Sequence, residues 1–197
     1  MHSILKSLSF KLAIIMAATL PFLHGVPASA AITTGTLVKS PSFSAVYYVG
    51  ADSKRYVFFN AKVYASWYQN FTTVQTVTDS ELASLRLGGN VTYRPGVRMI
   101  KIQSDPKVYA VARNGTLRYI SSETVAAALY GPTWNQFIDD VDVTEFVNYR
   151  IGLPVNVPGD FNAVLETAQA VSINVDKGLL AGDPASGPAP VPTSGRL

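Results

Sequence analysis

The sequence predicts an α+β fold built from two tandem modules, each a small β-hairpin followed by a short helix and a further strand. Three observations predict it. One segment recurs along the chain, its apolar runs are rich in β-branched and aromatic residues and end at turn signals, and each pair of runs precedes a stretch typical of a short capped helix. A mainly β arrangement, with the two copies closed like a barrel or a propeller, is the structural alternative.

The recurring segment is seen when the sequence is aligned with itself. With two inserted residues, four stretches of the first copy align with four of the second: Leu37–Lys39 with Met99–Lys101, Val46–Val49 with Val108–Val111, Arg55–Val57 with Arg118–Ile120, and Leu87–Gly88 with Ile151–Gly152. Because so few insertions are needed, we interpret the chain as a duplicated unit.

Each copy is expected to contain the same elements in the same order. They are an opening strand at 36–39 and 98–102, a hairpin turn at 50–53 and 114–115, a helix at 61–68 and 123–130, and a strand at 74–77 and 137–141. Asn114-Gly115 suits a tight hairpin turn because both residues tolerate positive φ. Ser121 or Ser122 is expected to be the N-cap of the second helix.

The N-terminus is expected to be a secretory signal peptide spanning residues 1–30. Lys6 and Lys11 precede an apolar run at 12–23, and the small residues Ala28-Ser29-Ala30 precede Ala31. The apolar run is too short for a bilayer-spanning helix, which needs roughly twenty residues. The protein is therefore expected to be secreted, extracellular or associated with the cell surface, with no membrane span after cleavage.

Four further segments follow the signal. Module 1 spans 31–89 and module 2 spans 90–152, and the short connector between the repeats ends in Pro95-Gly96. Residues 153–180 are expected to form a C-terminal β segment, because apolar residues alternate along Val171–Val175. Residues 181–197 are rich in Pro, Ala and Gly, a composition that predicts a disordered tail.

The composition excludes several function classes. Both histidines, His2 and His24, lie in the expected signal, and there is no cysteine. Ser-His or Cys-His catalysis, disulfides, and zinc sites of imidazole or thiolate are therefore not expected. Loss of Lys6 and Lys11 lowers the formal net charge from +3 by two, to +1, and no long basic run remains, so a nucleic-acid partner is not expected.

The one group of hard oxygen ligands lies at Asp139, Asp140, Asp142 and Glu145. It lacks the ligand spacing and the glycine of an EF-hand loop, so a solvated turn is the preferred interpretation. We expect no metal, no cofactor and no enzymatic activity.

The candidate binding residues are aromatic residues that differ between the copies. Residues common to both are expected to serve the fold, so an aromatic confined to module 1 is free to form a platform that stacks on sugar rings or anchors a partner protein. These residues are Tyr48, Phe58, Phe59 and Trp67, which align with Ala110, Ser121, Ser122 and Tyr130. The alternative is that they pack against module 2 or the C-terminal segment.

Three stretches carry a resemblance to a known kind of module: VYYVGADSKRYVFFNAKVYASWY, LGGNVTYRPGVRMIKI and DPKVYAVARNGTLRYIS. Together they resemble the tandem Val-Tyr hairpin repeat modules of uncharacterised exported bacterial cell-surface proteins. Ser53 and Phe59 depart from that pattern, in which glycine and proline are common at these two places. The resemblance implies a location at the cell surface or envelope and supplies no catalytic residues.

The leading functional expectation is a non-catalytic extracellular module that binds envelope glycan or a surface protein. A self-assembling structural component of a surface layer or appendage is the alternative, and an enzyme is the third hypothesis. The absence of histidine and cysteine after residue 30 argues against the third.

The signal-peptide interpretation predicts that the exported protein begins at Ala31. N-terminal sequencing of the protein collected outside the producing cell is the measurement. Recovery of a folded, membrane-held product that still carries Met1 would show that the segment is not cleaved.

Overall fold

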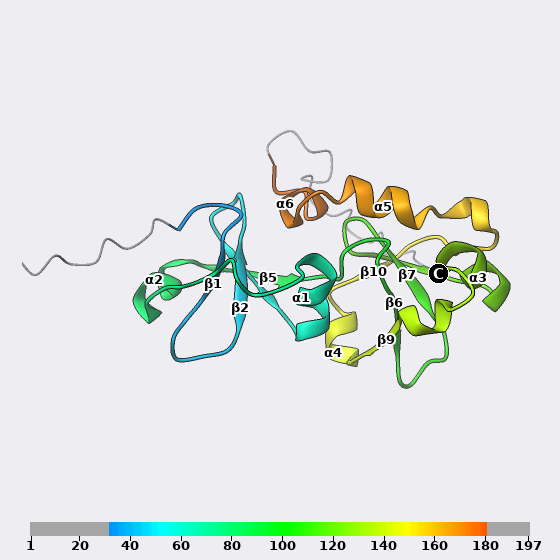
Figure 1. Ribbon diagram of the computed structural model, residues 1–197, viewed down its shortest axis with the longest axis horizontal. Helices are drawn as coiled ribbons and strands as arrows, with labels where there is room; N and C mark the ends of the chain where they lie inside the picture. The colour runs from blue at the N-terminus through cyan, green and yellow to red at the C-terminus, as the bar shows by residue number, and fades with distance from the viewer. Residues whose placement is uncertain (1–31, 181–197) are drawn as a thin grey trace, which may run out of the picture. The chain divides into compact units, whose positions relative to one another are not determined.

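The described residues of the computed structural model are 32–180. The expected signal peptide and the expected disordered tail lie outside this range. The described chain has an α+β fold with two five-stranded mixed sheets, and short helices lie between the strands and after the second sheet (Figure 1). Neither sheet closes into a barrel within residues 32–180, so the barrel-like alternative is wrong.

The elements of module 1 alternate between short strands and short helices. They are β1 (Leu37–Lys39), β2 (Val46–Val49), β3 (Arg55–Phe58), α1 (Ala61–Trp67), β4 (Val74–Thr76), α2 (Asp79–Ser84) and β5 (Leu87–Val91). Those of module 2 are β6 (Met99–Ile102), β7 (Tyr109–Ala112), β8 (Thr116–Tyr119), α3 (Glu123–Tyr130), the 3-10 helix η1 (Trp134–Phe137), β9 (Ile138–Val141), α4 (Val143–Phe146) and β10 (Arg150–Ile151).

The two sheets have the same arrangement of corresponding strands. The order is β4-β1-β2-β3-β5 in the first sheet and β9-β6-β7-β8-β10 in the second. In both, the three central strands pair antiparallel, and each edge strand pairs parallel to its neighbour. This common topology is what a duplicated unit requires.

The hairpin register corrects the alignment of the copies. Val49 lies opposite Arg55, and Val111, which aligns with Val49, lies opposite Leu117. Arg55 therefore corresponds to Leu117, and its expected correspondence with Arg118 is wrong by one residue. The two hairpin loops are equal in length, so no inserted residue lies between these strands.

The turns and helix starts follow from local chemistry. Asn114 and Gly115 have φ values of 58° and 60°, which confirms a tight turn of the type that needs two positive φ angles. Helix α1 begins after Asn60, whose side chain accepts hydrogen bonds from the second and third helical N–H groups, and Ser122 caps α3. Both expected helices are therefore confirmed.

A short helix follows the fourth strand of each module, α2 after β4 and α4 after β9. Thr78 caps α2 and Asp142 caps α4 through their side-chain oxygens. In α2, Glu81 Oε2 accepts a hydrogen bond from the backbone N–H of Thr78, which completes a capping box. The edge strands β4 and β9 are thus each followed by a short capped helix that leads to the opposite edge strand of the same sheet, β5 or β10.

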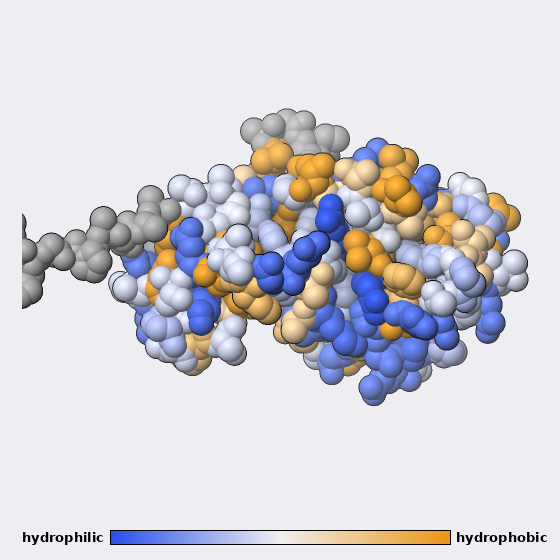
Figure 2. All heavy atoms as spheres, viewed as in Figure 1, coloured by the Kyte–Doolittle hydropathy of each residue, from blue (hydrophilic) through white to orange (hydrophobic). Residues whose placement is uncertain are grey.

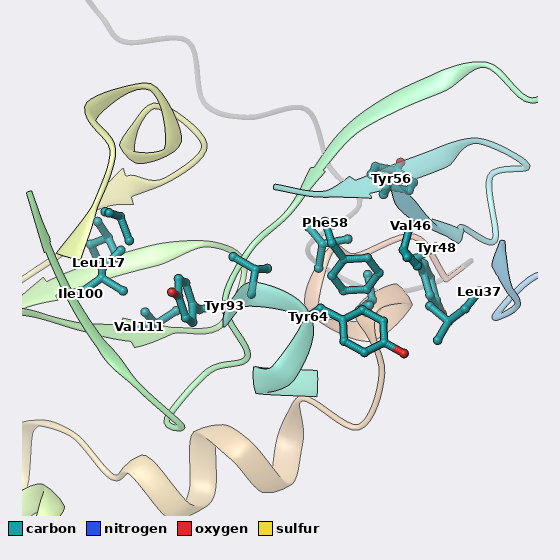
Figure 3. Close-up of a cluster of buried hydrophobic side chains, with 14 of the residues drawn as sticks. Leu37, Val46, Tyr48, Tyr56, Phe58, Tyr64, Tyr93, Ile100, Val111 and Leu117 are labelled. Carbon is teal, nitrogen blue, oxygen red and sulfur yellow. The ribbon is translucent and has the colours of Figure 1, made fainter. Parts of the chain in front are cut away.

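A shared hydrophobic core joins the two sheets. In Figure 3, Tyr93 of the connector lies between module 1 side chains such as Phe58 and module 2 side chains such as Val111. Tyr93 is completely buried. The buried members are Leu37, Val46, Tyr48, Tyr56, Phe58, Val63, Tyr64, Val91, Tyr93, Ile100, Tyr109, Val111, Leu117, Val141 and Ile173. We call the face of the first sheet that enters this core its inner face.

The other face of each sheet has a smaller core. On module 1, helix α2 covers Val38 and Val49 with Leu82. On module 2, helix α3 covers Ala110 and other small or aliphatic residues, and Phe161 of the C-terminal segment completes that cluster. Each sheet is therefore covered on both faces.

The C-terminal segment is helical, and the expected strand at Val171–Val175 is wrong. It contains the short 3-10 helix η2 (Pro158–Asp160), α5 (Ala163–Gln169) and α6 (Ile173–Asp176). Ser172 caps α6 by accepting a hydrogen bond from the Val175 N–H. Apolar residues gather over α5 and α6 on the face seen in Figure 2.

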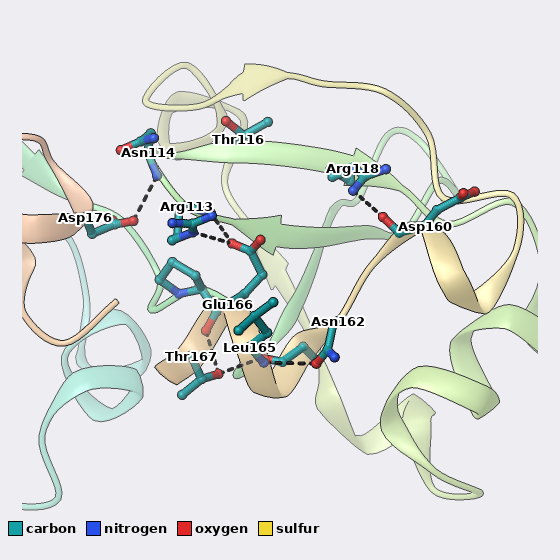
Figure 4. Close-up of polar contacts among 12 residues, drawn as sticks. Arg113, Asn114, Thr116, Arg118, Asp160, Asn162, Leu165, Glu166, Thr167 and Asp176 are labelled. Carbon is teal, nitrogen blue, oxygen red and sulfur yellow. Dashed lines mark hydrogen bonds and ion pairs between the residues drawn. The ribbon is translucent and has the colours of Figure 1, made fainter. Parts of the chain in front are cut away.

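Helix α6 ties together the hairpin turns of the two modules. Asn174 Oδ1 accepts a hydrogen bond from Ala51 N in the first turn, at 2.9 Å. Asp176 Oδ1 accepts one from Asn114 N in the second turn, also at 2.9 Å (Figure 4). The C-terminal segment thus holds two hairpin turns that are far apart in the sequence, one from each sheet.

The close approach of α5 to the connector predicts the effect of a single methyl group. Gly96 has a φ of 75°, and a Cβ there would collide with the carbonyl oxygen of Ala163. Gly96→Ala should lower the free energy of unfolding by at least about 2 kcal/mol in urea denaturation. Gly35→Ala is the matched control, because Gly35 has a φ of 84° with open space around it. Equal losses in the two variants would show that α5 is not packed on Gly96.

Candidate functional site

Two of the four candidate aromatics lie in the shared core. Tyr48 is 3% exposed and Phe58 is 6% exposed, so the expectation that they form an exposed platform is wrong. The inner face of the first sheet meets a second sheet, whereas Ala110, at the position of Tyr48, lies under helix α3. Tyr48 and Phe58 therefore pack in the core between the modules, which is the packing alternative considered for them.

Trp67 links helix α1 to the connector. Its indole Nε1 donates a hydrogen bond to Thr92 O at 2.9 Å, and the Arg94 guanidinium lies 5.6 Å from the ring centroid. The ring is partly buried against the shared core. Trp67 therefore serves packing, and its polar atom is already occupied.

Phe59 is the candidate that faces solvent. It follows the last residue of β3, so strand alternation turns Phe58 inward and Phe59 outward. Phe59 is 43% exposed and lines a pocket of about 400 Å³, which we call the Phe59 pocket. The pocket is lined by Ser44, Ala45, Val46, Val57, Phe58, Phe59, Asn60, Ala61, Tyr64 and Phe71.

A stacked pair of rings forms one wall of the Phe59 pocket. The Phe71 ring lies 4.2 Å from the Tyr64 ring, centroid to centroid, with 12° between their planes. Tyr64 Oη donates to Asn70 O at 2.7 Å, which holds the loop carrying Phe71. Phe71 is 57% exposed. Sequence reasoning missed both rings, although an aromatic residue in the polar loop Gln69-Asn-Phe-Thr-Thr73 was an available signal.

The lining of the Phe59 pocket has no charged side chain. Its polar side-chain groups belong to Ser44, Asn60 and Tyr64, and the Tyr64 hydroxyl is bonded to Asn70 O. The Asn60 amide is already engaged, since it accepts from two α1 N–H groups and donates to Glu145 Oε2 at 2.9 Å. Aromatic faces with few free polar groups suit the C–H face of a sugar ring or an apolar side chain.

The acidic group of module 2 is partly buried, so its interpretation as a solvated turn is wrong for two members. Asp139 is 5% exposed and Glu145 is 3% exposed. Asp139 accepts two hydrogen bonds from Arg98, at 2.9 and 3.0 Å, and pairs with Lys62 of module 1 at 3.0 Å. Burial acts to raise the pKa of Asp139, but these two cations outweigh it and lower the pKa.

Glu145 joins the two modules through the capping residue of α1. Its Oε2 accepts from Asn60, while Oε1 has no hydrogen-bond partner among residues 32–180. Burial and the charges of Asp139 and Asp142 raise the pKa of Glu145 to about 7. A carboxyl group buried between the modules is therefore partly protonated near neutral pH.

Among residues 32–180, no three acidic or histidine side chains converge to hold a metal ion. None of the helices in that range is long and apolar enough to cross a membrane.

No family model matches the chain, and no curated protein and no solved structure is similar to it.

The raised pKa of Glu145 predicts that it makes stability depend on pH. Its ordinary pKa of 4.5 rises to about 7 on folding, so between these values the folded protein binds more protons than the unfolded chain. Its contribution to stability therefore falls as pH rises through this window. Glu145→Gln keeps the acceptor for Asn60 and removes the charge. The free energy of unfolding of this variant, relative to that of wild type, should therefore rise by on the order of 2 to 3 kcal/mol between pH 4 and pH 8.

The measurement is urea unfolding of both proteins across that pH range. Glu123→Gln, at the exposed start of α3, is the matched control and should follow the wild-type curve. If the free energy of unfolding of Glu145→Gln changes with pH in parallel with that of wild type, the raised pKa of Glu145 is contradicted.

Proposed function

We propose that this protein is a non-catalytic extracellular module that holds an uncharged ligand in the Phe59 pocket. The ligand is a sugar ring of envelope glycan or an apolar side chain of a surface protein. The observation that carries the proposal is the pair of exposed rings, Phe59 and Phe71, beside a pocket of about 400 Å³. Pockets that hold small ligands begin at roughly this size.

The setting of the rings supports a binding role. Phe71 is stacked on Tyr64, and Tyr64 belongs to a helix whose N-cap is bonded to module 2. A wall held in this way loses little conformational entropy when a ligand binds. The resemblance to exported cell-surface repeat modules is consistent with an envelope ligand.

The lining chemistry supports a non-catalytic role. The side chains around the pocket include no Asp, Glu, Lys, Arg or His, so none of them is suited to proton transfer near neutral pH. The buried carboxylates Asp139 and Glu145 are not among the lining residues, although Asn60 connects the pocket to Glu145. An acid–base reaction at this pocket would have no donor or acceptor of suitable pKa.

Head-to-tail self-assembly receives less support. We call the face of the first sheet opposite its inner face the outer face. In a head-to-tail assembly, the outer face of the first sheet of one molecule would make the kind of contact that the second sheet makes with module 1 within one chain. Arg55 lies on that outer face, over the Tyr47 ring, at the position where module 2 buries Leu117 completely. At the other end, α3 and Phe161 cover the second sheet. Polar or covered outer faces are typical of the terminal units of repeat proteins.

Removing either exposed ring should weaken attachment with little loss of stability. Phe59→Ala and Phe71→Ala should each reduce retention of residues 31–197 on isolated cell envelope by about tenfold or more, because an aromatic anchor contributes strongly to binding. Phe43→Ala is the matched control, because Phe43 is 72% exposed and lies outside the pocket lining. Binding isotherms and thermal melts of all three variants are the measurements.

Treatment of the envelope distinguishes the two ligand classes. Loss of retention after glycan digestion indicates a sugar ligand, and loss after protease treatment indicates a surface protein. Equal retention of wild type, Phe59→Ala and Phe71→Ala on untreated envelope would overturn the proposal.

A further inference from the structure

We propose that a second pocket, beside α5, binds a carboxylate carried on an apolar group. This site is independent of the Phe59 pocket and its proposed ligand. It has a volume of about 460 Å³ and lies where the connector, α3, η1 and α5 meet. Its lining residues are Arg94, Gly96, Val97, Leu129, Tyr130, Phe137, Ala163, Val164, Thr167 and Ala168.

Two of these side chains have buried donors that lack an acceptor. Arg94 Nε and Tyr130 Oη are buried and have no hydrogen-bond partner among residues 32–180. The Arg94 guanidinium makes one long hydrogen bond, from Nη2 to Thr167 O at 3.4 Å. Leaving a buried donor unpaired is unfavourable, and more so for a charged one. Both atoms are closed off from solvent, so a ligand oxygen would reach them only after the Arg94 and Tyr130 side chains turn toward the pocket. An acceptor that reached them would remove the cost of leaving them unpaired.

The ion pairs around the pocket leave Arg94 available for an anion. The neighbouring carboxylate of Glu166 is occupied by Arg113, whose backbone N and side-chain Nε donate to it at 2.8 and 3.3 Å (Figure 4). No carboxylate in the described part of the chain forms an ion pair with Arg94. Arg94 is instead held over the Trp67 ring. Its positive charge therefore lacks a counter-ion on the pocket side.

Tyr130 is suited to act as a donor there. Burial, and to a smaller extent the charge of Glu166, raise the pKa of the Tyr130 phenol. The phenol therefore keeps its proton at physiological pH. A carboxylate oxygen is a stronger acceptor for that O–H than a neutral oxygen.

Apolar side chains form the rest of the pocket. Leu129 and Phe137 line it from module 2, Val97 from the residue after the connector, and Val164 from α5. Helix α5 is fixed against the connector, because Thr167 Oγ1 donates to Pro95 O at 2.8 Å. The apolar wall is thus held in place, and the pocket has room for a group the size of a phenyl ring or a leucine side chain.

The ligand class follows from this combination of groups. Arginine can engage both oxygens of a carboxylate, and the phenol adds a further donor, while the apolar wall takes the hydrocarbon part. A free apolar acid and the C-terminal carboxylate of a peptide that ends in an apolar residue both offer this chemistry. Their neutral amides share the shape and lack the charge.

Calorimetric titration of residues 31–197 with 3-phenylpropionate, and separately with a tetrapeptide ending in leucine, tests the proposal. Binding of either acid, with its amide at least about tenfold weaker because the charge-assisted bonds are lost, is the expected result. Stronger binding of the peptide identifies a chain terminus as the ligand, and stronger binding of the small acid identifies a free acid. Failure of both acids to bind at 10 mM (roughly the weakest useful affinity) would overturn the proposal.

Two variants test the assigned donors. Tyr130→Phe removes an unpartnered O–H, so it should melt at the same temperature as wild type or higher, and bind the acid about 3- to 10-fold more weakly. Arg94→Gln should weaken binding about tenfold or more. Phe59→Ala, in the other pocket, is the control and should bind the acid like wild type. Unchanged affinity in folded Tyr130→Phe and Arg94→Gln would contradict the site, and Tyr130→Phe alone decides the matter if Arg94→Gln does not fold.

Discussion

The shared core between the two sheets is the constraint on which the other features of the described chain depend. The inner face of the first sheet packs through Phe58 and neighbouring rings, Tyr93 of the connector fills the centre, and the second sheet closes the core with Val111. A module of about sixty residues buries a small core by itself, so much of the apolar burial exists only when the modules meet. The short connector follows from this contact, because its residues are themselves part of the core.

Both proposed pockets are held in place by the contact between the two modules. Across the interface, Glu145 holds the N-cap Asn60 and thereby orients α1, which carries Tyr64 of the Phe59 pocket. At the other end of α1, Trp67 donates to the connector and lies under Arg94 of the second pocket. Helix α1 therefore connects the two proposed pockets, because it carries Tyr64 of the first pocket and Trp67, which lies against Arg94 of the second.

Local signals in the sequence predicted the local structure well and the long-range packing poorly. The positive φ angles of Asn114 and Gly115 and the capped helices depend on a few adjacent residues. The strand register does not, and matching Arg55 to Arg118 by residue type introduced an insertion that the hairpin lengths exclude. The alternation in Val171–Val175 is too short to separate a strand from one helical turn. Ser172, which caps α6, was the signal that favoured helix.

Residues that differ between the two copies have different surroundings, and the difference can arise either from packing or from binding. The two copies have unequal neighbours: the inner face of the first sheet meets another sheet, whereas the corresponding face of the second meets α3 and the C-terminal segment. Phe58, which corresponds to Ile120 by register, is explained by that difference because both residues are buried. Phe59 corresponds to Ser121, and both positions are exposed. A large ring in place of a serine at a solvated position gains nothing from the shared core. Phe59 is therefore the one of the four aromatic candidates whose presence in module 1 the shared core does not explain.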